Sequence, residues 1–117
     1  MSTDTHFTHW MWKKTSPTIK HVPFAMAADP SGAVSRRYGV WQPSSGLNHR
    51  GRFLIDPDGV IQAVEVLSAP VGRNVEELIR QIQAFQAVRA HPGQAAPAGW
   101  TPGKPMIDTD KDAIGAY

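Results

Sequence analysis

One tight turn constrains the fold of this sequence more than any other feature. It reads Asp56-Pro57-Asp58-Gly59 and separates two apolar runs, residues 52–55 and residues 60–67. Pro57 presets φ at the second turn position, and Gly59 can adopt the positive φ that closes such a turn. The sequence therefore predicts an antiparallel pair of strands joined at this point.

An amphipathic helix is predicted directly after the hairpin. Asn74 can cap its first turn, and Glu77 stands three residues further on, as in a capping box. The apolar side chains that follow keep a spacing near 3.6 residues and form one face, which consists of Val75, Leu78, Ile79, Ile82, Phe85 and Val88. Pro92-Gly93 ends the helix, and the Pro- and Gly-rich sequence beyond it predicts an extended tail.

The remaining elements carry weaker signals. Asp4 or Thr5 can cap a first helix over residues 6–14, in which Trp10-Met11-Trp12 predicts partial burial. An apolar run at 22–27 predicts a buried strand, residues 33–38 a short helix, and residues 39–46 a loop. The order helix, strand, helix, hairpin, helix, tail indicates an α/β fold whose three strands bury little core.

The size and composition are those of one globular domain. The chain has 117 residues, of which 41% are hydrophobic and 19% are charged, and this balance argues against disorder. No apolar run is long enough to cross a membrane, so no membrane partner is expected. The first ten residues lack a secretion signal, which predicts a cytoplasmic location. The net charge of +2 comes from scattered lysines and arginines, which do not indicate a nucleic-acid partner.

The chain contains no cysteine. No disulfide, thiolate nucleophile, thiolate metal ligand or thiol redox switch is therefore possible within it. His6 and His9 are spaced to share a helix face, but two imidazoles fall short of the three or four ligands of a zinc site. His49 has no nucleophile beside it in the hairpin. We predict neither a metal site nor a cofactor.

Five collinear segments resemble the C-terminal half of typical two-cysteine peroxiredoxins, in particular the peroxidase subunit of bacterial alkyl hydroperoxide reductase. They are STDTHFTHW at 2–10, DPSGAVSRRYGV at 29–40, HRGRFLIDPDGVIQAVEV at 49–66, PVGRNVEELIRQIQAFQ at 70–86 and HPGQAAPAGW at 91–100. The resemblance implies a partial thioredoxin-like fold that lacks the N-terminal central strands and the helix with the peroxidatic cysteine. Residues 1–92 match the domain, and residues 93–117 match the family's extended C-terminal tail.

The resemblance also assigns roles to single residues. Arg50 matches the arginine beside the peroxidatic sulfur, where a guanidinium favours the thiolate and stabilises the charge that develops as the O–O bond breaks. Arg73 matches a second arginine of the same network. Ala96 stands at the position of the resolving cysteine, so that position is vacated here. Without the resemblance, both arginines would be interpreted as solvated surface residues.

The second strand of the hairpin matches the edge strand through which family members form dimers. An exposed edge of this kind is prone to strand pairing, and the alternative is an edge shielded by Glu65 or by the tail. Residues 5–8 resemble, more weakly, the interface that builds rings of dimers. The dimer-edge residues are Val60, Ile61, Gln62, Ala63, Val64, Glu65 and Val66.

The family activity is thiol-dependent reduction of hydroperoxides in antioxidant defence. Because the chain has no cysteine, we predict that it has no peroxidase activity by itself. Two alternatives stay open: a non-catalytic module that joins full-length peroxiredoxin oligomers, or one piece of a split peroxidase that an N-terminal half completes in trans. Either way, a homo-oligomer or a hetero-oligomer is expected, because sheet edge and helix face would otherwise be exposed.

Overall fold

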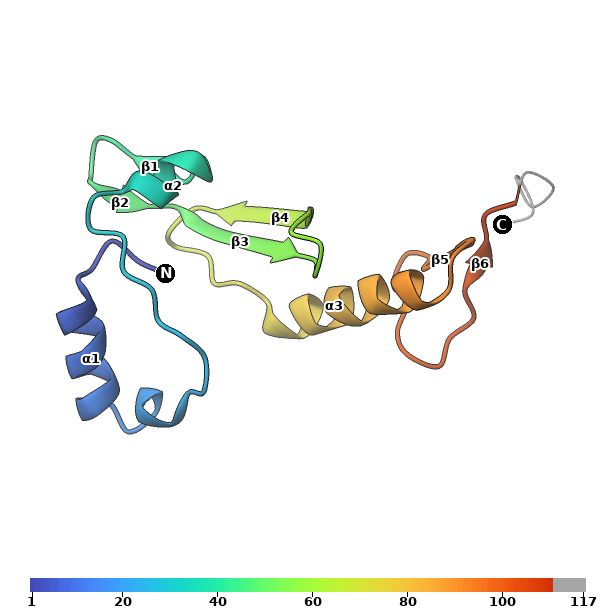
Figure 1. Cartoon of the computed structure of the whole chain (residues 1–117), viewed down its shortest axis with the longest axis horizontal. Helices are drawn as coiled ribbons and strands as arrows, with labels where there is room; N and C mark the ends of the chain where they lie inside the picture. The colour runs from blue at the N-terminus through green and yellow to red at the C-terminus, as the bar shows by residue number, and fades with distance from the viewer. Residues whose placement is uncertain (111–117) are drawn as a thin grey trace. The chain divides into compact units, whose positions relative to one another are not determined.

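A computed structural model describes residues 1–110 and divides the chain into two compact units (Figure 1). Within the described part, the first unit comprises residues 1–52 and 64–71, and the second comprises residues 53–63 and 72–110. The first contains helix α1 (His6–Thr15), the 3-10 turn η1 (Ile19–His21), helix α2 (Ala33–Arg37), and strands β1 (Trp41–Gln42) and β2 (Leu47–Asn48). Helix α3 (Val75–Ala90) and strands β5 (Gln94–Ala95) and β6 (Ile107–Asp108) belong to the second. The hairpin of β3 (Arg50–Ile55) and β4 (Ile61–Leu67) contributes to both.

The predicted hairpin is confirmed. Strands β3 and β4 pair in one two-stranded sheet and run in opposite directions (Figure 1). The turn closes through a hydrogen bond from Asp56 N to Val60 O (2.9 Å), and Gly59 has a φ of 82°. The Asp56 carboxylate accepts hydrogen bonds from the backbone of Asp58 and Val60 (both 2.9 Å). These bonds, that of Val60 foremost, hold the pKa of this carboxyl below its ordinary value.

Helix α3 is also confirmed, with the cap that the sequence predicts. Asn74 Oδ1 accepts a hydrogen bond from the backbone of Glu77 (3.1 Å). Its apolar face is only half covered, however: Leu78 and Ile82 are half-buried, while Val75 and Ile79 are 62% and 50% exposed. None of the helix's side chains is buried. A 16-residue amphipathic helix thus leaves part of its apolar stripe in solvent.

The predicted strand at 22–27 is wrong. This segment is irregular, and only a bridge between Ser2 and Ala28 resembles sheet structure. Ser2 N donates to Ala27 O (3.2 Å), and Asp29 N donates to Ser2 O (2.8 Å). A strand needs a neighbouring row of backbone donors and acceptors, and among the described residues only Ser2 lies beside this segment.

Partial burial of Trp10-Met11-Trp12 is also wrong, because these residues are 60%, 48% and 51% exposed. Helix α1 itself begins where predicted, with Thr5 Oγ1 accepting from Thr8 N (3.3 Å). The side chain of α1 that is buried is His9, which is only 7% exposed. Local sequence predicted the helix, whereas the face it covers depends on residues distant in the chain.

Two short pairings lie outside the predicted elements. Strands β1 and β2 form an antiparallel pair inside the predicted loop 39–46 and just after it, with Trp41 opposite Asn48. Strands β5 and β6 pair antiparallel, with Ala95 opposite Ile107, so the tail folds back on itself and is not extended throughout. Two-residue strands carry no periodic signal in the sequence. The division into a domain at 1–92 and a tail at 93–117 stays a prediction, and residues 111–117 lie outside the described part.

The first unit contains a buried polar network that joins α2 to β2. Ser35 donates to Asp29 Oδ2 through both its hydroxyl (2.6 Å) and its backbone N–H (2.8 Å). Asn48 Nδ2 donates in turn to Ser35 Oγ (2.8 Å). Asp29 and Ser35 are 4% and 2% exposed. The Ser35 hydroxyl, and then its backbone N–H, hold the pKa of the Asp29 carboxyl below its ordinary value of 3.8.

This network predicts acid sensitivity of the first unit. Because the pKa of Asp29 is lower in the folded than in the unfolded chain, its stabilisation is present at neutral pH and is lost as the pH falls from about 3.8 through the folded value. We expect Asp29→Asn to unfold at lower urea concentration than the wild type at pH 6, and the difference between the two midpoints to shrink as the pH is lowered below about 3.8. The exposed Asp110→Asn should follow the wild type across this pH range. An Asp29→Asn midpoint that falls with pH as steeply as the wild type's would contradict this assignment.

Candidate functional site

Ala96 lines a hollow of about 430 Å³ in the second unit. The surrounding side chains are small or apolar, and they come from β4, from α3 and from the tail: Ala63, Ala84, Phe85, Val88, Ala95 and Pro97. Arg80 and Gln81 supply the polar part of the wall. Ala96 is half-buried, and a larger side chain at this position has room in the hollow. None of these residues is a nucleophile.

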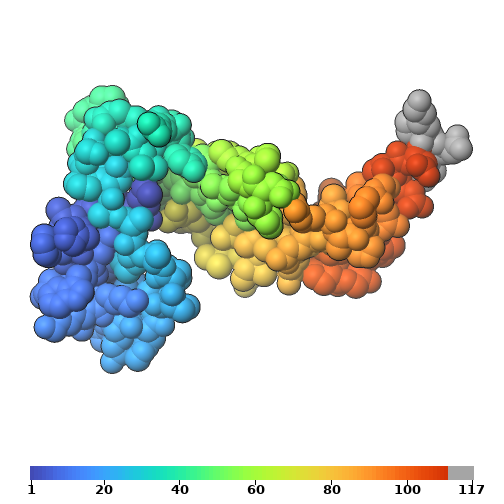
Figure 2. All heavy atoms as spheres, viewed as in Figure 1, coloured from blue at the N-terminus to red at the C-terminus, as the bar shows by residue number. Residues whose placement is uncertain are grey.

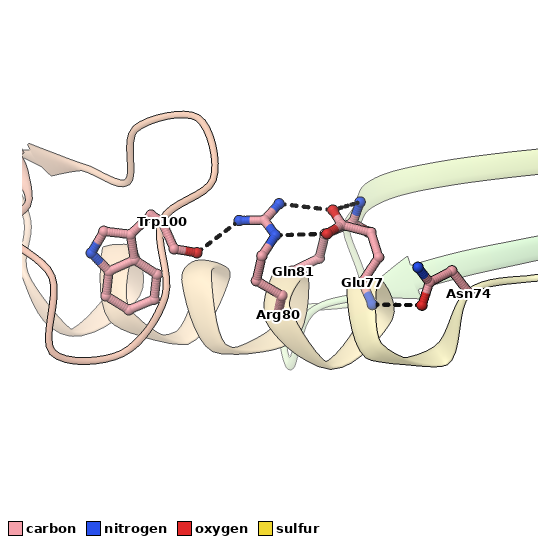
Figure 3. Close-up of polar contacts among 5 residues, drawn as sticks. All are labelled: Asn74, Glu77, Arg80, Gln81 and Trp100. Carbon is pink, nitrogen blue, oxygen red and sulfur yellow. Dashed lines mark hydrogen bonds and ion pairs between the residues drawn. The ribbon is translucent and has the colours of Figure 1, made fainter.

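An ion-pair network attaches the tail to α3 (Figure 3), and two of its members, Arg80 and Gln81, line this hollow. Arg80 donates two hydrogen bonds to the Glu77 carboxylate, from Nε (2.7 Å) and from Nη2 (2.8 Å). Its Nη1 donates to the backbone carbonyl of Trp100 (2.9 Å), and Gln81 Nε2 donates to Glu77 Oε1 (3.0 Å). The hydrogen bonds to Glu77 raise the pKa of the Arg80 guanidinium, so it stays charged. Arg80 thereby links the helix to the loop that follows Ala96.

Trp100 anchors the same loop through its side chain. It is 6% exposed, and its Nε1 donates to the backbone carbonyl of Lys104 (3.0 Å). Trp100 and Val40 are the two buried apolar side chains among the described residues. In the sequence, Trp100 was noted only as the last residue of the segment at 91–100, and its burial was not predicted. A tryptophan in a Pro- and Gly-rich segment signals an anchor, because such a segment has few other apolar groups to bury.

Arg50 and Arg73 lie in different compact units and are described separately. Arg50 begins β3, is exposed, and donates from Nε to the backbone carbonyl of Ala69 (2.8 Å). This bond ties the start of β3 to the segment after β4. Arg73 is exposed in the segment that precedes α3. His49, next to Arg50, accepts a hydrogen bond at Nδ1 from the side-chain amide of Gln42 (2.9 Å).

The predicted interface strand is exposed on one face. Within residues 60–66, Val64 and Val66 are 55% and 47% exposed, and they share a face because side chains alternate along a strand. Ala63 and Glu65 on the other face are half-buried, and Glu65 forms an ion pair with Arg52 of β3 (3.3 Å). Among residues 1–110, β4 pairs with β3 alone, so its other edge is open.

The structure adds a cluster that sequence reasoning missed. Ser2 Oγ donates to Asp4 Oδ2 (2.6 Å) and contacts Nε2 of the buried His9 (2.7 Å). Ser2 stands between the carboxylate and the imidazole, whereas a catalytic triad needs the imidazole in the middle. The cluster therefore clamps the N-terminus onto α1. Within the described part of the chain, no group of three or more His, Asp or Glu side chains could hold a metal ion.

An α/β chain with this hairpin, this C-terminal helix and this tail is of the peroxiredoxin type. The chain belongs to the AhpC/TSA family, whose model matches residues 1–64, and residues 84–117 match the C-terminal domain of 1-Cys peroxiredoxin. The resemblance seen in the sequence and the partial thioredoxin-like fold are thereby confirmed. Among residues 1–110, no helix combines the length and apolar character needed to cross a bilayer.

Named relatives match nearly the whole chain. It is 43% identical to alkyl hydroperoxide reductase C of Salmonella typhimurium, covering 98% of this chain and 62% of that protein. It is 49% identical to the selenocysteine-containing peroxiredoxin PrxU of Peptoclostridium acidaminophilum, covering 98% of this chain and 59% of that protein. The chain thus spans about 60% of the length of these two relatives.

Solved structures of the family superpose well. The reduced 2-Cys peroxiredoxin of Plasmodium vivax is 30% identical with a TM-score of 0.88, covering 99% of this chain and 61% of that one. The AhpC of Enterococcus faecalis is 36% identical with a TM-score of 0.76, covering 82% of this chain and 57% of that one.

Proposed function

We propose that this chain is a peroxiredoxin-family polypeptide that does not reduce hydroperoxides by itself. The observation that carries this proposal is the absence of any cysteine among its 117 residues. Reduction of a hydroperoxide by this family's chemistry starts with a thiolate that attacks the O–O bond. Arg50 and Arg73 have supporting roles, because a guanidinium stays protonated and is no nucleophile. The decisive test is turnover of peroxide by the pure chain.

Ala96 is, in this proposal, the vacated position of the resolving cysteine. Its place beside a hollow, in a loop held by Arg80 and Trp100, supports this assignment. The chain retains the presenting loop but lacks the sulfur. We place the chain in the cytoplasm, the location predicted from its sequence, where thiols are kept reduced.

A cysteine restored at this position should capture an oxidised partner. The variant Ala96→Cys is mixed with alkyl hydroperoxide reductase C whose own resolving cysteine is replaced by serine. Peroxide converts that partner's peroxidatic thiol to a sulfenic acid, and the thiol introduced by the substitution condenses with it, forming the S–S bond and releasing water. We expect a covalent heterodimer on a non-reducing gel. Dithiothreitol should reduce its disulfide and restore the two separate chains.

The matched control is Ala98→Cys, an exposed position two residues further along the same loop. Its yield of heterodimer should be about a tenth of that of Ala96→Cys or lower, because disulfide formation depends on the placement of both sulfurs. Equal yields from both variants would show that position 96 has no special geometry.

A second candidate function is that of a partner-dependent piece of a peroxidase. It is favoured by the incomplete burial of α3, which leaves Val75, Ile79 and Val88 exposed by 62%, 50% and 37%. An amphipathic helix normally buries its stripe against the rest of a domain. The partner in this proposal is the N-terminal half of a family member, or a full-length peroxiredoxin that receives the chain in its oligomer. Strand β4 supplies an open edge for such an assembly, with Val64 and Val66 on its exposed face.

We expect the chain to bind the separately produced N-terminal half of alkyl hydroperoxide reductase C and to melt cooperatively only in that complex. Replacing Val75 and Ile79 by serine should weaken the complex by about tenfold or more, since both side chains lose apolar contact area. Lys104→Ser, at an exposed position outside α3, should leave the affinity unchanged. Calorimetric titration measures these affinities. A sharp melt of the isolated chain as a monomer would contradict this candidate.

A further inference from the structure

The segment between β5 and β6, residues 96–106, forms a loop of defined shape, which we call the tail loop. The antiparallel pairing of β5 with β6 closes its base. Within the loop, Trp100 Nε1 donates to the backbone carbonyl of Lys104 (3.0 Å), and the backbone N–H of Trp100 donates to Pro97 O (3.0 Å). Figure 2 shows atoms of the tail, drawn in dark orange, against those of α3 in the second unit.

The guanidinium of Arg80 joins the tail loop to α3. Its Nη1 donates to the backbone carbonyl of Trp100 (2.9 Å), while Nε and Nη2 donate to the two carboxylate oxygens of Glu77 (2.7 and 2.8 Å). A carboxylate that binds a guanidinium through both oxygens fixes the plane of that group. Glu77, which also accepts a hydrogen bond from Gln81 Nε2 (3.0 Å), therefore aims the third nitrogen of Arg80 at the loop.

These contacts lie where the side chains are partly or fully withdrawn from water. The side chains of Arg80 and Glu77 are 27% and 37% exposed, and Trp100 is 6% exposed. An i, i+3 ion pair on a helix surface contributes little to stability by itself. The bond from Arg80 to the Trp100 carbonyl differs, because its donor is charged and it joins groups 20 residues apart in the chain. All of these residues belong to the second unit, so the contacts that hold the loop come from within that unit.

We propose that Arg80 is a positioning residue, which holds the tail loop on α3 and thereby keeps position 96 beside its hollow. Arg80 lines that hollow together with Ala96. Its planar fork reaches acceptors on two segments at once, and the single ammonium of a lysine cannot reproduce that geometry. The meaning given to position 96 rests on the proposed function, whereas the docking of the loop by Arg80 does not.

Hydrogen–deuterium exchange of the full chain, measured by mass spectrometry of its peptides, tests the proposal without any cysteine. In Arg80→Met, which keeps an aliphatic stem but has no donor, peptides from the tail loop should exchange about tenfold faster or more than in the wild type. Peptides from α3 should keep the exchange of the wild type, because the cap by Asn74 remains. Arg80→Lys should resemble Arg80→Met, because the charge alone does not hold the loop.

The matched control is Arg89→Met, which makes the same substitution on the same helix. Arg89 pairs with Asp58 of the hairpin turn (2.7 Å), so its loss should leave the exchange of the tail loop unchanged. Access to position 96 is measured in the Ala96→Cys variant. The introduced thiol should be alkylated by iodoacetamide faster when Arg80→Met is added, because the loop then leaves the hollow more often.

Unchanged exchange of the tail loop in Arg80→Met would overturn the proposal, and so would an unchanged rate of alkylation. Equal loss of protection in α3 would also overturn it, because Arg80 would then support the helix in general. Rescue by Arg80→Lys would show that charge suffices and would contradict the positioning role. If the exchange result holds while Ala96→Cys captures no oxidised partner, the function proposed for position 96 fails and the docking of the loop by Arg80 stands.

Discussion

We expect the purified chain, treated with a chelator, to show no catalytic turnover of hydroperoxide. The reaction catalysed by this family passes through a cysteine thiolate, and the chain has no cysteine. Its strongest remaining sulfur nucleophiles are four methionine thioethers, each of which can reduce one peroxide and becomes a sulfoxide. Without a reductase, methionine oxidation therefore ends at four equivalents per chain.

Consumption of a hydroperoxide is followed by ferrous xylenol orange, with alkyl hydroperoxide reductase C and its thiol reductant as positive control. Mass spectrometry of the chain afterwards counts the oxygen atoms gained by methionine. Sustained turnover beyond four equivalents per chain would show a catalytic group other than sulfur and would overturn the proposed function. Turnover that appears only after an N-terminal half is added would instead support the split peroxidase. The two outcomes are distinguishable because the second needs a partner with a cysteine.

The second large effect is expected from Gly32→Ala. Gly32 precedes α2 with a φ of 68°, a conformation that L residues rarely adopt. A Cβ atom at this position would lie 2.6 Å from Cζ3 of Trp41, well inside van der Waals contact. A shift of Trp41 away from this atom would also disturb the contact with the Arg36 guanidinium, which lies over the Trp41 ring at 4.5 Å from its centroid. Backbone strain and steric overlap together should destabilise the first unit by about 2–4 kcal/mol.

Gly46→Ala separates the two contributions. Gly46 has the same φ of 68°, but no atom lies within 4 Å of the position of its Cβ. The Gly46→Ala substitution should lower the free energy of unfolding only by the strain of a positive φ, about 1 kcal/mol. Urea unfolding of both variants, followed by tryptophan fluorescence, measures the difference. Equal losses from the two substitutions would mean that Trp41 does not pack on Gly32 in solution.

Local sequence was sufficient for the hairpin and for the two longer helices. Pro57 and Gly59 dictate the turn through their own backbone preferences, and Asn74 and Thr5 cap helices through side chains a few residues from the groups they satisfy. These interactions span at most four residues, so they can be identified without knowing the fold. The strand predicted at 22–27 is absent because a strand needs a second strand to pair with. The apolar composition of the segment does not reveal whether such a partner exists.

Some features of the candidate site were likewise predicted from the sequence, and others became visible only in the structure. The vacated position at Ala96 and the roles of Arg50 and Arg73 came from motifs, and they stay predictions. The hollow beside Ala96, the bond from Arg80 to Trp100 and the burial of His9 came from the structure. The periodicity of the sequence does not predict these three features, because each depends on contacts between separate elements or with an irregular terminus.

By itself, the sequence determined the local turns and caps, the family, and the absence of sulfhydryl chemistry, because each is a property of residue identity and short spacing. Only the tertiary structure decided which apolar side chains are covered. Trp100 is buried while Trp10 and Trp12 stay in solvent, although all three are equally apolar. Burial depends on which distant segments come into contact, and that is a property of the assembled chain.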